Sequence, residues 1–386
     1  MKRLILSFTI LLSCSYCTGH QYRSLEDEIQ DIMAEYHAIG SSVVVVRDNK
    51  IIYTHTFGYN PDYNDMSHRN AIPDDGIFWL ASISKTFIST AIMQLVEKNM
   101  LKLDDDVNKY LKFIVRNPRY PDVPITIRML LCHRSSINDK HYGWTLKMMD
   151  SKIYERYKEC FNTYCPGYKY HYSNLNYNLL GAIIEEIMGI RFDQYIDEYI
   201  CTPLGLNASF NLTKMDSTRL VRTLKYDKRK HGFIKDFSIF NYQYIEDKVK
   251  DYKLGWSTAS LSPAGGMRIT VTDLAIWMMA HMNYGSFNGN RILKKDTELA
   301  MWEPQTHDIN YGFAFSHYNK IVNGEDFIGM TGGSHGINSV MFFDPVKKCG
   351  FVVITNGYIP ISGKGRLSSL ARELVRPLYK HFIQDK

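Results

Sequence analysis

The stretch FWLASISK, residues 78–85, decides the fold. It opens a segment, residues 82–100, in which apolar side chains return every three or four positions. This spacing predicts a buried helix that begins near Ser82. Residues three apart share one face of a helix, so the hydroxyl of Ser82 and the amine of Lys85 are expected to lie together.

Strands are predicted near both ends of the chain. Residues 42–47 and 50–55 are β-branched runs joined by Asp48-Asn49, a pair that tolerates the left-handed backbone of a tight hairpin. Strand composition returns in three later runs, at residues 327–331, 337–343 and 351–355.

Helical spacing fills the remainder. It is found at residues 25–36 with Ser24 as N-cap, at 176–188 ended by Gly189, at 192–200 ended at Thr202-Pro203, at 272–282 capped by Thr270 or Thr272, and at 367–382. The sequence therefore predicts an α/β (α+β) fold, in which both chain ends build an antiparallel sheet flanked by helices. A mostly helical region, about residues 101–300, is inserted between them.

Composition excludes an intrinsically disordered protein and gives no sign of nucleic-acid binding. A chain of 386 residues with 45% hydrophobic content can bury a sizeable core. The formal net charge is only +6 and the basic residues are scattered, apart from a run at 228–231 that is expected to be a solvated loop. We therefore expect no nucleic-acid partner, while the oligomeric state stays open.

The first residues are typical of an export signal, assigned to residues 1–19. Lys2-Arg3 precede an apolar stretch, residues 4–12, that is too short to span a bilayer. Leu11-Leu12-Ser13-Cys14 also resembles the bacterial lipobox, so ordinary cleavage and lipidation of Cys14, with membrane attachment, both stay open. The mature domain, residues 20–386, is expected in the periplasm or cell envelope.

The seven cysteines lack the spacing and the histidine partners of a zinc site, so no metal is expected. Cys160 and Cys165 flank a short loop that a disulfide could close in an oxidising compartment. Spacing alone does not establish that pairing.

Serine and lysine at this spacing have a chemical use. A serine hydroxyl is a weak nucleophile near neutral pH, and a lysine can activate it only where burial or a neighbouring cation lowers the lysine pKa. The apolar residues before Ser82 favour such burial. Farther along, Tyr172-Ser173-Asn174 follows a Pro-Gly turn; its phenol can relay a proton, and its amide can hold an acyl substrate. Each motif alone also fits an ordinary helix start.

Together the motifs resemble the superfamily that contains class C β-lactamases, D-alanyl-D-alanine carboxypeptidases and family VIII esterases. The resemblance runs along most of the mature chain in the family's order: SISK (82–85), ITIRMLLCH (125–133), YSN (172–174), LLG (179–181), PLGL (203–206), PAGGM (263–267), TDL (272–274) and YGF (311–313).

The resemblance implies an acyl-enzyme mechanism without a cofactor. Ser82 would attack a carbonyl, Lys85 and Tyr172 would handle the protons, and Asn174 would hold the substrate. Ester and amide substrates, including β-lactams and D-amino-acid peptides, are not separated by sequence.

The family's third motif corresponds here to Met330-Thr331-Gly332-Gly333. The amides of Ser82 and Gly333 would form the oxyanion hole, and the whole segment would line the substrate site. Methionine stands where the family usually has lysine or histidine, which argues against recognition of a substrate carboxylate. His335 would either replace the missing polar group at the rim or simply connect strands.

Two alternatives stay open. GGSHG, residues 332–336, also fits a nucleophile elbow with Ser334 as nucleophile and with Asp344 and His381 as partners, but the strand composition that follows disfavours it. The second alternative is a catalytically silent, penicillin-binding-like receptor for cell-wall peptide, which the methionine at position 330 motivates.

Overall fold

The computed structural model describes residues 23–236, 242–305, 309–360 and 369–384. The predicted export signal, with Lys2-Arg3 and Cys14, lies outside the described residues, as do the first two residues of the predicted C-terminal helix. Within the described residues, no helix is both long enough and apolar enough to cross a membrane.

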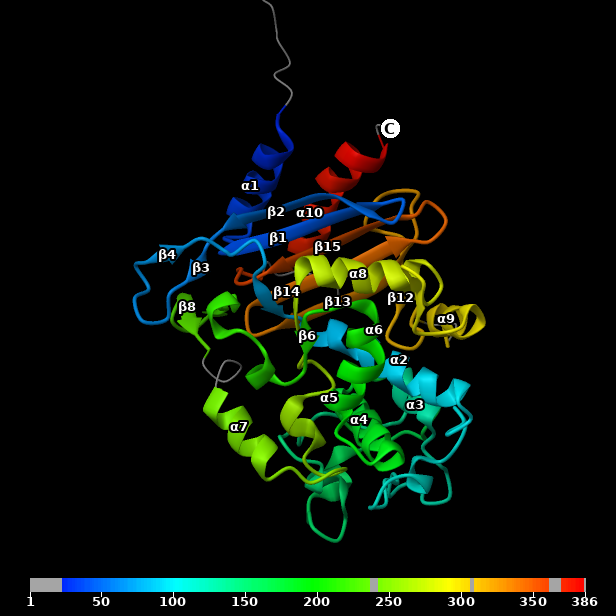
Figure 1. Ribbon diagram of the computed structural model, residues 1–386. Helices are drawn as coiled ribbons and strands as arrows, with labels where there is room; N and C mark the ends of the chain where they lie inside the picture. Colours follow the sequence, from blue (N-terminus) through cyan, green and yellow to red (C-terminus); the bar gives the residue numbers. More distant parts are fainter. Residues whose placement is uncertain (1–22, 237–241, 306–308, 361–368, 385–386) are drawn as a thin grey trace, which may run out of the picture.

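A six-stranded antiparallel sheet in the order β12-β13-β14-β15-β1-β2 forms the centre of the upper half of the molecule (Figure 1). Its strands are β1 (Gly40–Arg47), β2 (Lys50–Gly58), β12 (Ser316–Tyr318), β13 (Phe327–Ser334), β14 (Ile337–Asp344) and β15 (Cys349–Thr355). Strand β1 pairs with β15, Ser41 opposite Thr355, which joins the two ends of the chain. The predicted α/β (α+β) fold, with an antiparallel sheet built from both chain ends, is confirmed.

Both faces of this sheet are covered, which explains the unbroken valine run of β1. Val43 and Val45 point to one core, and Val44 and Val46 point to the other, because strand side chains alternate. Helices α1 (Leu25–Glu35) and α10 (Ser369–Tyr379) cover the first face, and α8 (Val271–Met282) covers the second (Figure 1). A π-helical turn, Lys380–Gln384, extends α10.

Local signals place the ends of these elements as predicted. Asp48 and Asn49, with φ of 50° and 62°, make the left-handed turn between β1 and β2. Ser24 caps α1 by accepting from the amide of Asp27 at 3.1 Å, and Thr270 caps α8 through its hydroxyl.

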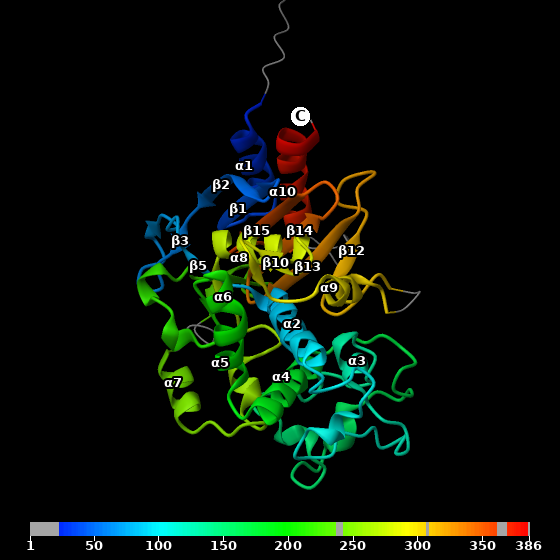
Figure 2. The same ribbon diagram turned by 45° about the vertical axis from the view of Figure 1, so that its right-hand side comes forward.

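The region between the sheet strands is partly helical and partly irregular. Its α-helices are α2 (Ser84–Glu97), α3 (Ile127–Leu131), α4 (Asn174–Met188), α5 (Phe192–Ile196), α6 (Thr202–Leu204), α7 (Tyr242–Lys250) and α9 (Lys295–Trp302). Short strands form four small sheets. In three of them two strands pair: β3 (Asn60–Pro61) with β4 (Arg69–Asn70), β7 (Leu224–Asp227) with β8 (Gly232–Lys235), and β10 (Ser286–Phe287) with β11 (Asn290–Arg291). In the fourth, β9 (Arg268–Thr270) lies between β5 (Ile77–Trp79) and β6 (Ala208–Ser209) and pairs with both. Figure 2 shows α2 between the sheet and α4, and its side chains from Ser84 to Leu95 are buried all round.

One expectation was wrong in detail, and one question that the sequence left open is answered. The helix from Phe192 does not stop at Thr202-Pro203; a π-helical turn (Asp197–Cys201) carries it into α6, which ends at left-handed Gly205. Pro203 occupies the first turn of α6, directly after the π-helical turn. Cys160 and Cys165 are both free, and the buried thiol of Cys160 faces the carbonyl of Met148 at 3.5 Å.

Candidate active site

Ser82 lies on a sharp turn between a strand and a buried helix. Strand β5 leads into a single 3-10 turn, Ala81–Ile83, which runs directly into α2. Ala81 adopts a left-handed backbone with φ of 52°, a conformation that costs energy for a residue with a side chain. The amide of Leu80, bonded to the carbonyl of Met267 at 2.9 Å, anchors the turn. The hydroxyl of Ser82 is thereby held half-buried at the start of the helix.

Lys85 follows one turn later, and the structure buries it completely. Its Nζ lies 3.2 Å from Ser82 Oγ, 2.9 Å from Asn174 Oδ1 and 2.6 Å from the carbonyl oxygen of Ala264. The expected meeting of Ser82 and Lys85 is therefore present in the structure. Burial lowers the pKa of this lysine to about 7, against a smaller opposing effect from the charge of Asp139. A neutral amine beside the serine is accessible near neutral pH.

Tyr172 approaches Ser82 from the other side. Its phenol donates to Ser82 Oγ at 2.8 Å, and Lys85 Nζ lies 4.8 Å from the centre of its ring. Burial raises the pKa of the phenol far above its ordinary value. Tyr172 therefore remains protonated and acts as a hydrogen-bond donor to the same oxygen that Lys85 contacts.

The histidine of the 125–133 segment supports Tyr172 from behind. His133 is fully buried, its ring lies 4.3 Å from the ring of Tyr172, and its Nδ1 accepts from the amide of Ser173 at 3.2 Å. His133 is therefore a packed structural histidine.

Asp139 is a functional candidate that sequence reasoning missed. Its carboxylate accepts from the hydroxyl of Ser173 at 2.7 Å and from the Nδ2 of Asn174 at 2.9 Å. The backbone amides of Asn174 and Leu175 complete the set, at 2.8 Å and 3.1 Å. In the sequence Asp139 is one acidic residue in an irregular loop, and only the Asx-type turn signal of Asn138-Asp139 marks it.

Strand β13 brings the third motif against the serine turn. A Cβ at Gly332 would collide with the carbonyl oxygen of Leu80 and would stand 3.2 Å from the amide nitrogen of Ser82, so only glycine permits this approach. Gly333 is exposed and lines the pocket. Thr331 is half-buried within the strand.

Met330 does not reach the pocket wall. It is buried in the main core, opposite Met341 of β14. The residue that stands at the family's usual lysine or histidine position therefore contributes packing here, with no polar group presented to a substrate.

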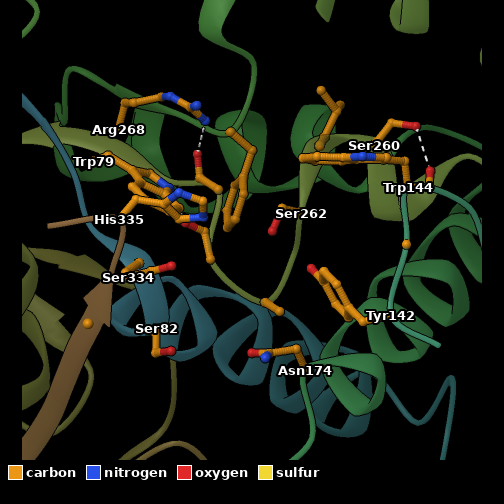
Figure 3. Close-up of a pocket in the computed structure, with 18 of the residues that line it drawn as sticks. Trp79, Ser82, Tyr142, Trp144, Asn174, Ser260, Ser262, Arg268, Ser334 and His335 are labelled. Carbon is orange, nitrogen blue, oxygen red and sulfur yellow. Dashed lines mark hydrogen bonds between the residues drawn. The ribbon is translucent and has the colours of Figure 1, made fainter. Parts of the chain in front are cut away.

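A cavity of about 480 Å³ opens over Ser82. In Figure 3, Ser82 and Asn174 lie along one side, Trp79 and His335 at one end, and Trp144 with Tyr142 at the other. Phe210, Ile245 and Leu261 add apolar surface, and buried Arg268 adds a positively charged group. The pocket is thus mainly aromatic and apolar, with polar groups along the side of Ser82 and Asn174 and with Ser334 and Arg268 near His335 (Figure 3).

His335 is held at the pocket wall by two contacts. Its Nδ1 is hydrogen-bonded to a carboxylate oxygen of Asp236, and its ring centre lies 5.3 Å from that of Trp79. The backbone at His335 is left-handed, with φ of 49°, in the turn between β13 and β14. It therefore both connects two strands and presents a fixed imidazole to the pocket.

The alternative triad is not assembled. Ser334 lines the pocket but pairs with Ile337 at the start of β14, so a strand follows it where a nucleophile elbow needs a helix. Asp344 closes the far end of the same strand and accepts from the amides of the following turn. His381 lies in the C-terminal π-helical turn beside Phe382.

A serine hydroxyl held between a buried lysine amine and a phenol defines a serine hydrolase type of site. A family model described as Beta-lactamase matches residues 25–375, so the chain belongs to the β-lactamase family. This match confirms the resemblance seen in the sequence, and the site is of the serine hydrolase type. Within the described residues, no group of three or more His, Cys, Asp or Glu side chains could hold a metal ion.

Individual relatives agree with membership of the β-lactamase family. Penicillin-binding protein 4* of Bacillus subtilis (strain 168) is 25% identical over 323 residues, covering 81% of this chain and 66% of that protein. The chain thus spans just under two thirds of the length of this curated relative. The octameric penicillin-binding protein homologue from Pyrococcus abyssi has a TM-score of 0.71 at 25% identity, over 92% of this chain and 77% of that one. The D-amino acid amidase from Ochrobactrum anthropi SV3, with a TM-score of 0.66 at 18% identity over 92% and 99% of the two chains, shares the fold.

Proposed function

We propose that this chain is an active acyl hydrolase in which Ser82 attacks the carbonyl carbon of an ester or amide. The observation that carries the proposal is the buried Lys85, whose Nζ stands 3.2 Å from Ser82 Oγ and whose pKa burial lowers to about 7. Burying a lysine is unfavourable, and a site that only bound ligand would gain nothing from a base poised beside a nucleophile.

The proton transfers follow from the contacts. Lys85, as a neutral amine, takes the proton of Ser82 while Oγ bonds to the carbonyl carbon. The amides of Ser82 and Gly333 would stabilise the oxyanion. Tyr172, which burial keeps protonated, is placed to donate its proton to the leaving group as the acyl-enzyme forms. The protonated Lys85 returns a proton to the phenol, so in net terms the leaving group receives the proton taken from Ser82. Water then cleaves the acyl-enzyme and frees an acid.

The substrate class is proposed from the pocket walls. Trp79, Trp144 and Phe210 favour an apolar or aromatic group on a small-molecule or peptide substrate. Met330 lies in the core and presents no charge to a substrate carboxylate, so Arg268 is the cationic side chain in the pocket wall. These walls support an ester or amide substrate that carries an apolar or aromatic group.

A substrate panel tests the proposal. The purified protein is assayed with a short-chain aryl ester, a chromogenic cephalosporin and a D-alanyl dipeptide, beside Ser82→Ala. We expect turnover of the ester that Ser82→Ala abolishes. Full activity in Ser82→Ala, or fluorophosphonate labelling of Ser334 in its place, would refute the assignment. Stoichiometric acylation by a labelled penicillin with no product release would favour the silent receptor.

We also propose that the protein is exported and acts in the periplasm or cell envelope. The support is the basic and apolar leader at residues 1–19. Fractionation of a bacterial host that expresses the full chain tests export, and Cys14→Ser tests lipidation. Retention in the cytoplasm would refute export. If Cys14→Ser is divided between the membrane and soluble fractions as the wild type is, the lipid anchor is refuted.

A further inference from the structure

The loop that carries Asp139 reaches the active site from outside the two recognised motifs. It is braced at Asn138, whose amide donates to the carbonyl of Cys160 at 2.9 Å and whose Nδ2 donates to that of Glu159 at 3.1 Å. The half-buried carboxylate of Asp139 therefore has a fixed position at the first turn of α4.

The carboxylate accepts from four donors, two on each oxygen. Oδ1 accepts from the hydroxyl of Ser173 and the amide of Leu175, and Oδ2 accepts from the amide and the Nδ2 of Asn174. Ser173, the N-cap residue, makes no capping bond with its own side chain. Asp139 thus caps α4 from another segment, where a negative charge is favourable.

The bond to Asn174 Nδ2 decides which way this amide faces. A side-chain amide has a donor end and an acceptor end, and a carboxylate can only accept from the donor end. With Nδ2 toward Asp139, Oδ1 faces Lys85 Nζ at 2.9 Å. Turning the amide over would set two oxygens against each other at hydrogen-bond distance, which is unfavourable.

The orientation of this amide controls the lone pair of Lys85. A neutral amine has two N–H groups, and its Nζ has two carbonyl neighbours that can only accept, on Asn174 and Ala264. When both N–H groups point to these oxygens, the lone pair is left for the hydroxyl of Ser82. A reversed Asn174 would donate its own N–H to that lone pair and compete with the serine.

We propose that Asp139 is a positioning residue whose carboxylate fixes Asn174 with its carbonyl oxygen toward Lys85. The inference rests on the proposed function, because it assigns Lys85 the role of base. The same carboxylate acts on Lys85 through its charge, which opposes the effect of burial. The other titratable groups against Lys85 are Tyr172 and Tyr177, at 4.8 Å and 5.6 Å from their ring centres. Burial keeps both phenols protonated, so neither contributes a charge.

Two variants separate geometry from charge, with the second-order rate of labelling by a fluorophosphonate as the readout. Asp139→Asn puts an N–H group where two donors must be accepted, so we expect a rate about 10²-fold lower, a typical cost of a misplaced catalytic group. The labelling rate of each protein is also measured as a function of pH, and the acid limb of this profile is the range in which the rate rises as Lys85 loses its proton. In Asp139→Asn the acid limb should move to lower pH, because loss of the negative charge lowers the pKa of Lys85. Asp139→Glu keeps the charge but misplaces it, so the rate should fall while the acid limb stays near that of the wild type.

A double-mutant cycle identifies the route of the effect. In an Asn174→Ala background, and at a pH where Lys85 is neutral so that the charge effect does not contribute, Asp139→Asn should cost little more, because the amide that it positions is gone. Asp65→Asn is the matched control: Asp65 accepts from a serine hydroxyl and a backbone amide, at 2.6 Å and 2.9 Å, in an exposed loop away from the pocket. Its labelling rate and pH profile should match the wild type.

Each outcome has one meaning. If the wild type is not labelled at Ser82, the proposed function fails. If it is labelled but Asp139→Asn shows the wild-type rate and acid limb, the positioning role is wrong. The same holds if the effects of Asp139→Asn and Asn174→Ala are fully additive, or if Asp139→Asn loses only thermal stability. If Asp139→Asn does not fold, a wild-type rate in Asp139→Glu would overturn the inference.

Discussion

Replacing Lys85 by methionine should make stability less dependent on pH. The lysine has a pKa of 10.5 in the unfolded chain and about 7 in the folded protein. Between these values the unfolded state binds a proton that the folded state does not, so stability of the wild type rises with pH through this window. Below about pH 7 both states are protonated and the penalty of the buried charge is fully present. Lys85→Met has no such group and lacks this rise.

The expected size follows from linkage. A full proton difference changes the free energy of unfolding by about 1.4 kcal/mol per pH unit. Since Lys85 is half-titrated near pH 7, the wild type should gain about 2 kcal/mol relative to Lys85→Met between pH 7 and pH 9. The same ionisation predicts that kcat/KM rises with pH through about 7, because the neutral amine is the active form.

Urea unfolding followed by tryptophan fluorescence measures the difference at several pH values. Groups that titrate in both proteins cancel in the comparison. Lys98→Met is the control for loss of a lysine from the same helix, because Lys98 is exposed at its end. Parallel stability curves for the wild type and Lys85→Met would refute the reasoning that burial holds Lys85 neutral.

Three further variants test the site. Tyr172→Phe should lower kcat about 10³-fold with little change in KM, since it removes a proton donor and no apolar surface; unchanged kcat would exclude Tyr172 as the acid. Gly332→Ala should lower the labelling rate of Ser82 and the melting temperature together, because its Cβ would push against the Leu80 carbonyl. Calorimetry and fluorophosphonate labelling show both effects, and wild-type values would refute the close approach. Ser334→Ala should keep ester hydrolysis within a few-fold of the wild type in a steady-state assay.

Much of the fold could be predicted because its signals are local. The hairpin at Asp48-Asn49, the cap at Ser24 and the stop at Gly189 each depend on a few neighbouring residues. The continuation of the helix past Pro203 was not predictable in this way. It depends on a π-helical turn that tertiary packing of Cys201 and Leu204 stabilises.

The same distinction between local signals and tertiary packing holds for the residues of the site. Ser82 and Lys85 meet because they are three residues apart on one turn, which a spacing rule captures. Asp139 and Asn174 are brought together by a loop with no periodic pattern, so no rule of spacing connects them. The place of Met330 also depends on tertiary structure, because strand alternation and the register with Met341 turn its side chain into the core.

The pairing of β1 with β15 has a consequence for how the protein is made. Val43 pairs with Val353, so the central sheet cannot close until almost the whole chain has emerged. Contacts this distant in sequence form late and slowly. Ser82 is synthesised early, yet the strand that carries Gly333 arrives near the end of synthesis. A nascent chain therefore holds its nucleophile without the partner amide, and the site becomes complete only when the two halves of the sheet join.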